Sequence, residues 1–311
     1  MFTRGATRNG DVVFQRLLAG AAALVLLIIG AMAIALTVAA WPAIEKFGLR
    51  FIVTSSWNPV SGRFGALPFV YGTLVSSAIA LFLAVPLGLS VAVFLAELAP
   101  GWLRVPVGFL VELLAAIPSV VYGLWGIFVL IPWVRVSVTP PLQAALGFLP
   151  FFQGPPLGLG MLTAGLILAI MVVPFIVAVS TEVMRAVPQA QREAALSLGA
   201  TQWETTRTAV MPYARSGIMG AIFLALARAL GETMAVTMVI GNVPQIKASL
   251  LAPAYTISAV IANEFAEATE NLYLAALMLI GLVLFVVTLA VNIGARLLVS
   301  RVAGGPALMR E

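Results

Sequence analysis

The sequence contains no cysteine and no histidine, and it has only two lysines. Without cysteine there are no disulfides and no thiolate chemistry. Without histidine the commonest metal ligand and the commonest general base are missing, so we expect no metal site, no cofactor and no catalytic residue. The two lysines, Lys46 and Lys247, follow Glu45 and Ile246, so neither can belong to the Gly-Lys loop that binds nucleotide phosphates. The sequence therefore predicts a protein that is not itself an ATPase.

Charged residues are also scarce, since they make up 9% of the 311 residues while 62% are hydrophobic. A soluble domain carries about 25% charged residues. The hydrophobic residues form runs that are long enough for the roughly 20 helical residues that cross a bilayer. We therefore predict an all-α, multi-pass membrane protein with one transmembrane domain over residues 1–311. The six predicted helices cover about residues 17–40, 71–95, 107–131, 161–184, 217–240 and 272–298.

The formal charge of +5 raises the question of a nucleic-acid partner. The basic residues lie between the apolar runs, however, and most of them fall on the same side as the N-terminus. Cytoplasmic loops carry such an excess, so we predict a membrane protein with both termini in the cytoplasm and no nucleic-acid partner. The first run is too long for a cleaved secretory signal, whose apolar part spans about 7–15 residues, and we expect it to remain as an anchor in the lipid.

Three prolines, Pro86, Pro118 and Pro174, fall inside predicted helices. Proline has no backbone N–H and leaves a carbonyl group of the preceding turn unpaired. Neighbouring membrane helices can satisfy such groups, and two interpretations stay open: bending points for movement, or static kinks that shape the packing.

The connection at residues 185–216 is the longest polar segment predicted on the cytoplasmic side. Good helix formers fill residues 189–198, and Gly199 is suited to end that helix in a left-handed turn. Thr201 and Glu204 have the spacing of a capping box, which predicts a second short helix. Two interpretations follow, a compact docking surface for a cytoplasmic partner and an amphipathic hairpin on the lipid headgroups.

The same segment carries a family signature. Glu193, Ala194, Ala195, Gly199 and Pro212 have the residue types and spacing of the loop found in permeases of bacterial ABC importers. The resemblance implies that the segment is the coupling loop, which fits a cleft in a separate ATP-binding subunit. It also implies that these residues are the coupling residues.

Other segments, residues 56–59, 69–74, 116–126 and 227–236, resemble the PstC-type permease subunit of phosphate-specific importers. The resemblance implies the type I ABC-importer permease architecture and transport of inorganic phosphate. It further implies three kinds of partner: a homologous second permease that completes a heterodimer, two ATP-binding subunits, and a periplasmic phosphate-binding protein.

Arg228 and Glu232 are charged residues within the fifth predicted helix. A charge in the middle of a membrane costs at least about 2.5 kcal/mol, so Arg228 should face a partner or a water-filled path. Glu232 is one helical turn away and is predicted to pair with it. The pair is either structural, or it is part of the substrate pathway, in which Arg228 offers a bidentate donor to an oxyanion and Glu232 holds the guanidinium between passages.

Alternative functions remain at this stage. An arginine fork suits phosphonate, sulfate and molybdate as well as phosphate, so the permease could carry another oxyanion. A proton-coupled secondary transporter, in which Arg228 and Glu232 relay protons, is the alternative from a different class, although it does not need the 185–216 loop. A membrane enzyme is disfavoured because histidine and cysteine are absent.

Overall fold

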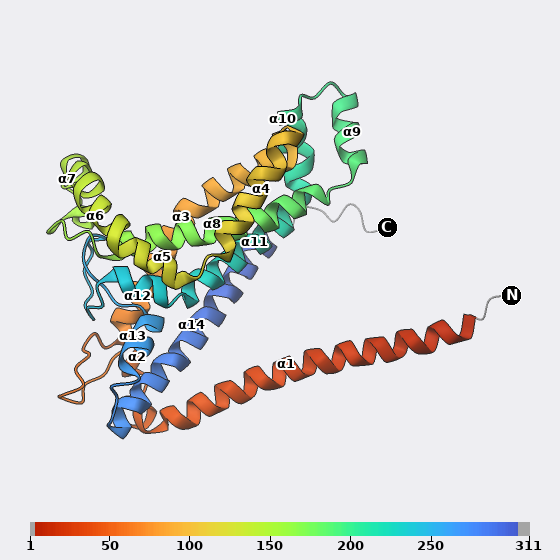
Figure 1. The fold of residues 1–311 in the computed structure, drawn as a ribbon. Coiled ribbons are helices and arrows are strands. Elements are labelled where there is room, and N and C mark those ends of the chain that lie inside the picture. Colours follow the sequence, from red (N-terminus) through yellow and green to blue (C-terminus); the bar gives the residue numbers. More distant parts are fainter. Residues whose placement is uncertain (1–3, 304–311) are drawn as a thin grey trace.

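The computed structural model describes residues 4–303, with side chains from residue 10 to residue 297 (Figure 1). Helices dominate, and the β-type pairing within the described residues consists of two isolated bridges, Asn58 with Arg63 and Gly241 with Ala254. The all-α prediction is therefore confirmed. The extreme termini, which the sequence predicts to be cytoplasmic, lie outside the described residues.

The helices differ widely in length. The long α-helices are α1 (Arg4–Phe47), α3 (Leu67–Val93), α4 (Gly101–Ala116), α8 (Met161–Arg185), α11 (Met211–Gly231) and α14 (Asn271–Ala303). The short α-helices are α2 (Arg50–Val53), α5 (Ser119–Trp125), α6 (Ile131–Trp133), α7 (Thr139–Leu146), α9 (Gln189–Ser197), α10 (Gln202–Thr205), α12 (Met234–Ile240) and α13 (Ile257–Glu264). The π-helical segments are η1 (Phe94–Leu98), η2 (Gly126–Leu130), η3 (Val134–Val138) and η5 (Thr206–Val210), and η4 (Pro150–Phe152) is a 3-10 turn.

Six helical segments of the described chain are long and apolar enough to cross a membrane, as the sequence predicts. They are Gly10–Phe47, Leu67–Leu98, Ser119–Leu146, Met161–Arg185, Gln202–Gly231 and Asn271–Leu297. The fourth is the most buried and forms the centre of the bundle, while the most apolar stretch of the first contains no buried residue in the single chain. Figure 1 shows the N-terminal part of α1 extending away from the other helices, while its C-terminal end packs against α14.

The third predicted helix, residues 107–131, is not one helix in the structure. α4 ends at Ala116, Ile117 is extended with ψ of 127°, and α5 begins at Ser119. Pro118 explains the break, because its ring disfavours the helical conformation of the preceding residue. The hydropathy of the run hides this break, and the membrane-crossing segment starts after it. The other two prolines, Pro86 and Pro174, lie inside the continuous helices α3 and α8.

The fifth predicted helix, residues 217–240, is also interrupted. α11 ends at Gly231, Glu232 is extended with φ of −68° and ψ of 132°, and α12 begins at Met234. The Glu232 carboxylate accepts a hydrogen bond of 3.4 Å from the backbone N–H of Ala235 and so satisfies one free donor at the start of α12. Two helices with a short non-helical junction therefore replace the continuous helix that the sequence predicts.

Close contact between α3 and α8 forms the centre of the bundle. A Cβ atom on Gly165 of α8 would lie 2.4 Å from Cγ2 of Ile79, and one on Gly88 of α3 would lie 2.8 Å from Cγ2 of Ile176. Both distances are shorter than any real contact, so the two backbones approach this closely only because the side chains are absent. Small residues have this role in membrane helices, whose association depends on van der Waals packing. The helices α4, α11 and α12 also pack on α8.

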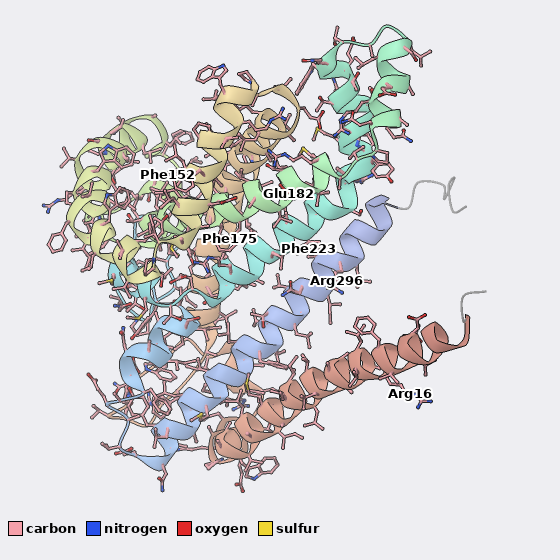
Figure 2. The ribbon with its side chains drawn as sticks, turned by 45° about the vertical axis from the view of Figure 1, so that its right-hand side comes forward. Arg16, Phe152, Phe175, Glu182, Phe223 and Arg296 are labelled. Carbon is pink, nitrogen blue, oxygen red and sulfur yellow. The ribbon has the colours of Figure 1, made fainter. Side chains whose placement is uncertain are left out.

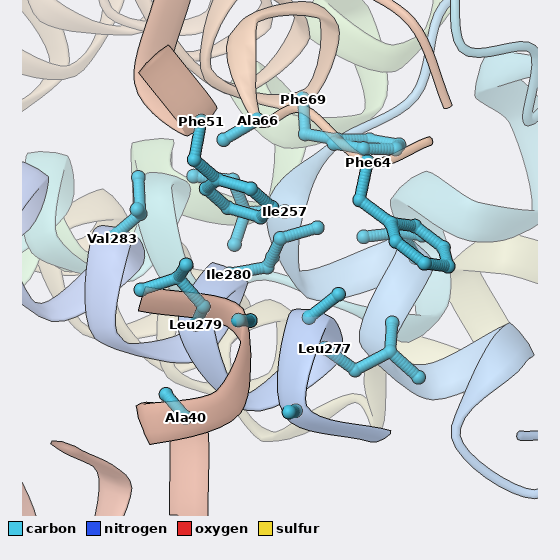
Figure 3. Close-up of a cluster of buried hydrophobic side chains, with 14 of the residues drawn as sticks. Ala40, Phe51, Phe64, Ala66, Phe69, Ile257, Leu277, Leu279, Ile280 and Val283 are labelled. Atoms are coloured by element: carbon cyan, nitrogen blue, oxygen red, sulfur yellow. The ribbon is translucent and has the colours of Figure 1, made fainter. Parts of the chain in front are cut away.

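An aromatic cluster closes the end of the molecule that lies away from the α9–α10 hairpin (Figures 1 and 3). The Trp57 ring packs edge-on against Phe64 and Phe69 at centroid distances of 4.8 and 4.9 Å. The Trp57 indole and the Tyr273 hydroxyl donate hydrogen bonds of 2.8 and 2.6 Å to the Glu264 carboxylate. These contacts join the irregular segment at residues 54–66 to α13 and α14.

The contact between α3 and α8 predicts opposite effects for two glycine substitutions. Gly165→Ala places a methyl group against Ile79 and should destabilise the chain by about 1–3 kcal/mol, the usual cost of overpacking. Gly220→Ala on α11, where a Cβ meets no atom within 4 Å, should leave stability unchanged or raise it by about 0.5–1 kcal/mol. Thermal unfolding of the purified chain in detergent is the measurement. Equal melting temperatures for the two variants would contradict this packing.

Candidate functional site

The segment between the fourth and fifth spans folds as the predicted helix-turn-helix, which we call the hairpin (α9, the turn and α10). Gly199 has φ of +87°, so the predicted left-handed turn is confirmed. Thr201 Oγ1 accepts the Glu204 N–H at 3.3 Å, and the Glu204 carboxylate accepts the Thr201 N–H at 2.8 Å, so the predicted capping box is confirmed as well. Both helix ends at the turn are thereby fixed without help from the membrane bundle.

The predicted coupling residues occupy the outer surface of the hairpin. Glu193, Ala194 and Gly199 are exposed, and Ala195 is half-buried. Pro212 is exposed in the first turn of α11, where a residue without an N–H is tolerated. The structure thus places four of the five on one short hairpin and the fifth at the start of the helix that follows it.

Exposed apolar side chains accompany these residues. Leu196, Leu198 and Trp203 are 46%, 89% and 55% exposed, and α9 has no buried residue. Figure 1 shows the hairpin projecting from one end of the bundle. An apolar, partly aromatic tip of this kind is suited to burial against another protein.

Arg192 fixes the hairpin to the bundle from its inner side. Its Nη2 and Nε atoms donate to the two carboxylate oxygens of Glu97 at 2.8 and 3.2 Å. The same guanidinium donates to the carbonyl groups of Met184, at 2.8 Å, and Val187. Glu97 lies at the end of the span that contains α3, and Met184 lies in the last turn of α8. One side chain therefore joins α9 to the ends of the two most closely packed helices.

The Arg192–Glu97 ion pair is protected from water, since the two side chains are 13% and 10% exposed. The hydrogen bonds that Arg192 donates to Glu97 raise the pKa of Arg192 above its usual range, although burial acts in the opposite direction. Sequence reasoning missed this pair because its partners are 95 residues apart and no spacing rule links them. Their predicted position at helix ends on the same side of the membrane was the one available signal.

Arg228, the predicted pathway cation, lies in the last turn of α11 beside the junction. Its guanidinium sits over the ring of Phe175 on α8, 4.5 Å from the ring centroid. Its Nε atom is buried and has no hydrogen-bond partner. Figure 2 shows Phe175 in the middle of the bundle, with Glu182 of the same helix nearer to the hairpin. The sequence did not reveal Phe175, which is one of many aromatic residues in apolar runs.

The predicted pairing of Arg228 with Glu232 is absent. The ion pairs among the described side chains join Arg185 to Glu182 and Arg192 to Glu97. The prediction was wrong because it assumed an uninterrupted helix, in which residues four apart share a face. Since α11 ends at Gly231, the Glu232 side chain turns to the start of α12 instead.

These features define what the site can do. The hairpin offers a fixed docking surface, the Arg192 contacts connect that surface to α3 and α8, and Arg228 supplies a desolvated cation with free donors. Within residues 10–297 no group of three or more His, Cys, Asp or Glu side chains could hold a metal ion. The guanidinium group of Arg228 offers hydrogen-bond donors of the kind that bind oxyanions.

Comparison with known proteins gives a consistent family. A model of the family described as "Binding-protein-dependent transport system inner membrane component" matches residues 84–304. The relatives include proteins named "Phosphate transport system permease protein PstC". The one from Mesorhizobium japonicum is 50% identical over 94% of this chain and 90% of its own length. Those from Xylella fastidiosa and Haemophilus influenzae are 48% and 45% identical, with 92% and 93% of their lengths covered.

Solved structures of ABC transporters share the fold. One is an inward-facing MetNI methionine ABC transporter, with a TM-score of 0.57 at 19% identity, matched over 75% of this chain and 94% of its own. Another is a bacterial ABC transporter involved in the import of alginate, with a TM-score of 0.56 at 17% identity, matched over 93% and 96%. The chain therefore belongs to the family of binding-protein-dependent transport system inner membrane components.

Proposed function

We propose that this chain is the permease subunit of an ATP-driven importer that carries inorganic phosphate across the bacterial inner membrane. The observation that carries the proposal is the identity of 45–50% with phosphate transport system permeases over more than nine-tenths of the chain. Phosphonate, sulfate and molybdate are less favoured because the relatives share one substrate name. The chain supplies the membrane path, and separate subunits hydrolyse ATP.

The hairpin is the proposed contact with an ATP-binding subunit. Glu193, Ala194, Ala195 and Gly199 would enter a cleft of that subunit, with Leu196 and Trp203 adding apolar area. Arg192 would carry a movement of the hairpin into α3 and α8, because its bonds reach the ends of both helices. A proton-coupled secondary transporter has no use for such a connection, so this alternative is disfavoured.

The proposed topology places the hairpin and both ends of the chain in the cytoplasm. In support, the described start of α1 and the described end of α14 lie on the same side of the molecule as the hairpin (Figure 1). The remaining partners would be a homologous second permease and a periplasmic phosphate-binding protein. The exposed length of α1 and the loop at the far end, where Val60 is 99% exposed, offer surfaces for them.

Arg228 is the proposed contact for the passing anion. A cation over an aromatic ring gains about 0.5–2 kcal/mol, which is enough to place the guanidinium and little enough for a phosphate to displace the ring. The planar fork then offers two parallel hydrogen bonds. Phe175 thus takes the resting role first assigned to Glu232. We keep Glu232 in the proposed pathway because its half-buried carboxylate accepts a single long bond at the junction.

The turn at Gly199 can be tested without disturbing any packing, since a Cβ there meets no atom within 4 Å. Gly199→Val should cost roughly 1–2 kcal/mol or more in the left-handed turn and reorient the hairpin. We expect normal membrane levels with loss of ATPase co-purification and of phosphate uptake. Gly199→Asn, which tolerates a left-handed conformation, should retain both. Wild-type uptake by the valine variant would show that the turn is dispensable.

The two ion pairs offer a matched test of coupling. Glu97→Gln leaves the Arg192 charge buried without its counter-charge, and breaking such a pair costs about 3–5 kcal/mol. We expect ATP hydrolysis by the assembled complex to persist while phosphate uptake falls at least about tenfold. Glu182→Gln breaks the exposed pair with Arg185, worth about 0–1 kcal/mol, and should change uptake less than twofold. Similar uptake by both variants would refute the connecting role of Arg192.

The pathway is tested by substitutions at Arg228. Arg228→Lys keeps the charge but loses the planar fork, and we expect phosphate uptake to fall at least about tenfold at unchanged expression. Arg215→Lys, an exposed position on the same helix, is the control and should transport normally. Phe175→Leu should reduce uptake and lower the melting temperature because the cation loses its ring. Near-normal uptake by Arg228→Met combined with Glu232→Leu would assign both residues to structure alone.

A further inference from the structure

A second basic site lies behind the hairpin, separate from Arg228. A pocket of about 450 Å³ opens where the start of α4, the end of α8, α9 and α10 meet. Three arginines line it, Arg104, Arg185 and Arg192, against one carboxylate, Glu97. The pocket therefore carries an excess of positive charge before any ligand is considered.

The three arginines differ in whether a carboxylate neutralises them. Arg192 is neutralised by Glu97, and Arg185 pairs with Glu182 on the exposed side of α8. Arg104 has no carboxylate partner, since none of the ion pairs of the described side chains includes it. It donates one hydrogen bond of 3.1 Å from Nη2 to the carbonyl of Ala99. The uncompensated charge of the pocket is thus concentrated at Arg104.

Two polar groups of the lining lack partners as well. The Nε atom of Arg104 and the hydroxyl of Thr205 are buried and form no hydrogen bond. Thr205 is only 5% exposed. Leaving a buried donor unsatisfied costs about 1–3 kcal/mol, and more for a charged group, so native proteins rarely keep one without a reason. Both atoms lie just below the pocket surface, so an anion in the pocket reaches them only if the lining side chains shift towards it.

We propose that this pocket binds a phosphate group and that the bound group ties α4 to the hairpin. Arg104 is the principal ligand, Thr205 adds a hydroxyl donor, and Arg185 contributes charge at the mouth. Because α9 and α10 form one wall of the pocket and α4 another, occupancy restricts the hairpin that the proposed function assigns to the ATPase contact. The site is therefore regulatory, and its placement on the cytoplasmic side rests on the proposed function.

The phosphate group could come from free inorganic phosphate, the imported product, or from the headgroup of an anionic lipid. The pocket is large enough for either. α4 also exposes Trp102, Val105 and Phe109 at 76%, 74% and 61%, an apolar surface suited to contact with lipid chains. Both sources offer the same oxygens to Arg104, and separate arms of one experiment distinguish them.

The experiment follows the melting temperature of the purified full chain in detergent. One arm titrates inorganic phosphate against chloride at equal ionic strength, and the other titrates phosphatidylglycerol against phosphatidylcholine. We expect one of the two probes to raise the melting temperature of the wild type. In Arg104→Gln, the probe concentration that gives half of the rise in melting temperature should increase at least about tenfold. This factor corresponds to the loss of one charge-assisted hydrogen bond. Arg207→Gln, exposed on η5 outside the pocket, should leave it unchanged.

Two further variants test whether the response to the probe comes from this pocket. Thr205→Val should stabilise the unliganded chain, because it removes an unsatisfied hydroxyl, and still weaken the response to the probe. Arg215→Lys, at an exposed position of α11 outside the pocket, should leave the response intact. A shift that survives Arg104→Gln and Thr205→Val, or no shift with either probe, overturns the proposed pocket. If the rise in melting temperature is lost only in Arg228→Lys, the probe binds at Arg228. The proposed pocket is then overturned, and the role of Arg228 in the transport pathway is supported.

Discussion

The close approach of α3 and α8 fixes the relative positions of both functional regions. Gly165 and Gly88 permit this approach, since a side chain on either would collide with an isoleucine of the opposite helix. α8 carries Phe175 near its middle and supplies the Met184 carbonyl near its end, so one rigid helix holds the ring under Arg228 and an acceptor for Arg192. A change at one end of α8 therefore has a direct structural route to the other.

Three partly buried arginines of the bundle differ in how completely they are hydrogen-bonded. Arg192 meets four acceptors, and each of its three side-chain nitrogen atoms donates at least one hydrogen bond. Arg228 and Arg104 differ, because each keeps a buried Nε without an acceptor. One of them faces an aromatic ring and the other an open pocket. An unpaired Nε atom thus distinguishes Arg228 and Arg104, which are suited to bind anions, from Arg192, which joins α9 to the bundle.

Sequence reasoning found what local chemistry determines. Hydropathy predicted the number of spans but misplaced the third and the fifth. The Gly199 turn and the Thr201–Glu204 box predicted the hairpin, because these depend on neighbouring residues. It missed the junction at Glu232, where no proline marks the end of α11, and it merged α4 with α5 although Pro118 was present. The Arg192–Glu97 pair and the contact of Arg228 with Phe175 depend on which helices pack together. A single sequence does not predict such contacts between distant segments.

The energy source of transport tests the proposed function most directly. The complete transporter, reconstituted in proteoliposomes with its ATP-binding and phosphate-binding partners, should accumulate radiolabelled phosphate only when ATP is present on the hairpin side. A protonophore should leave the rate unchanged, and excess sulfate should not compete. Accumulation that persists without ATP and collapses with the protonophore would contradict the coupling role of the hairpin and identify a proton-driven transporter instead.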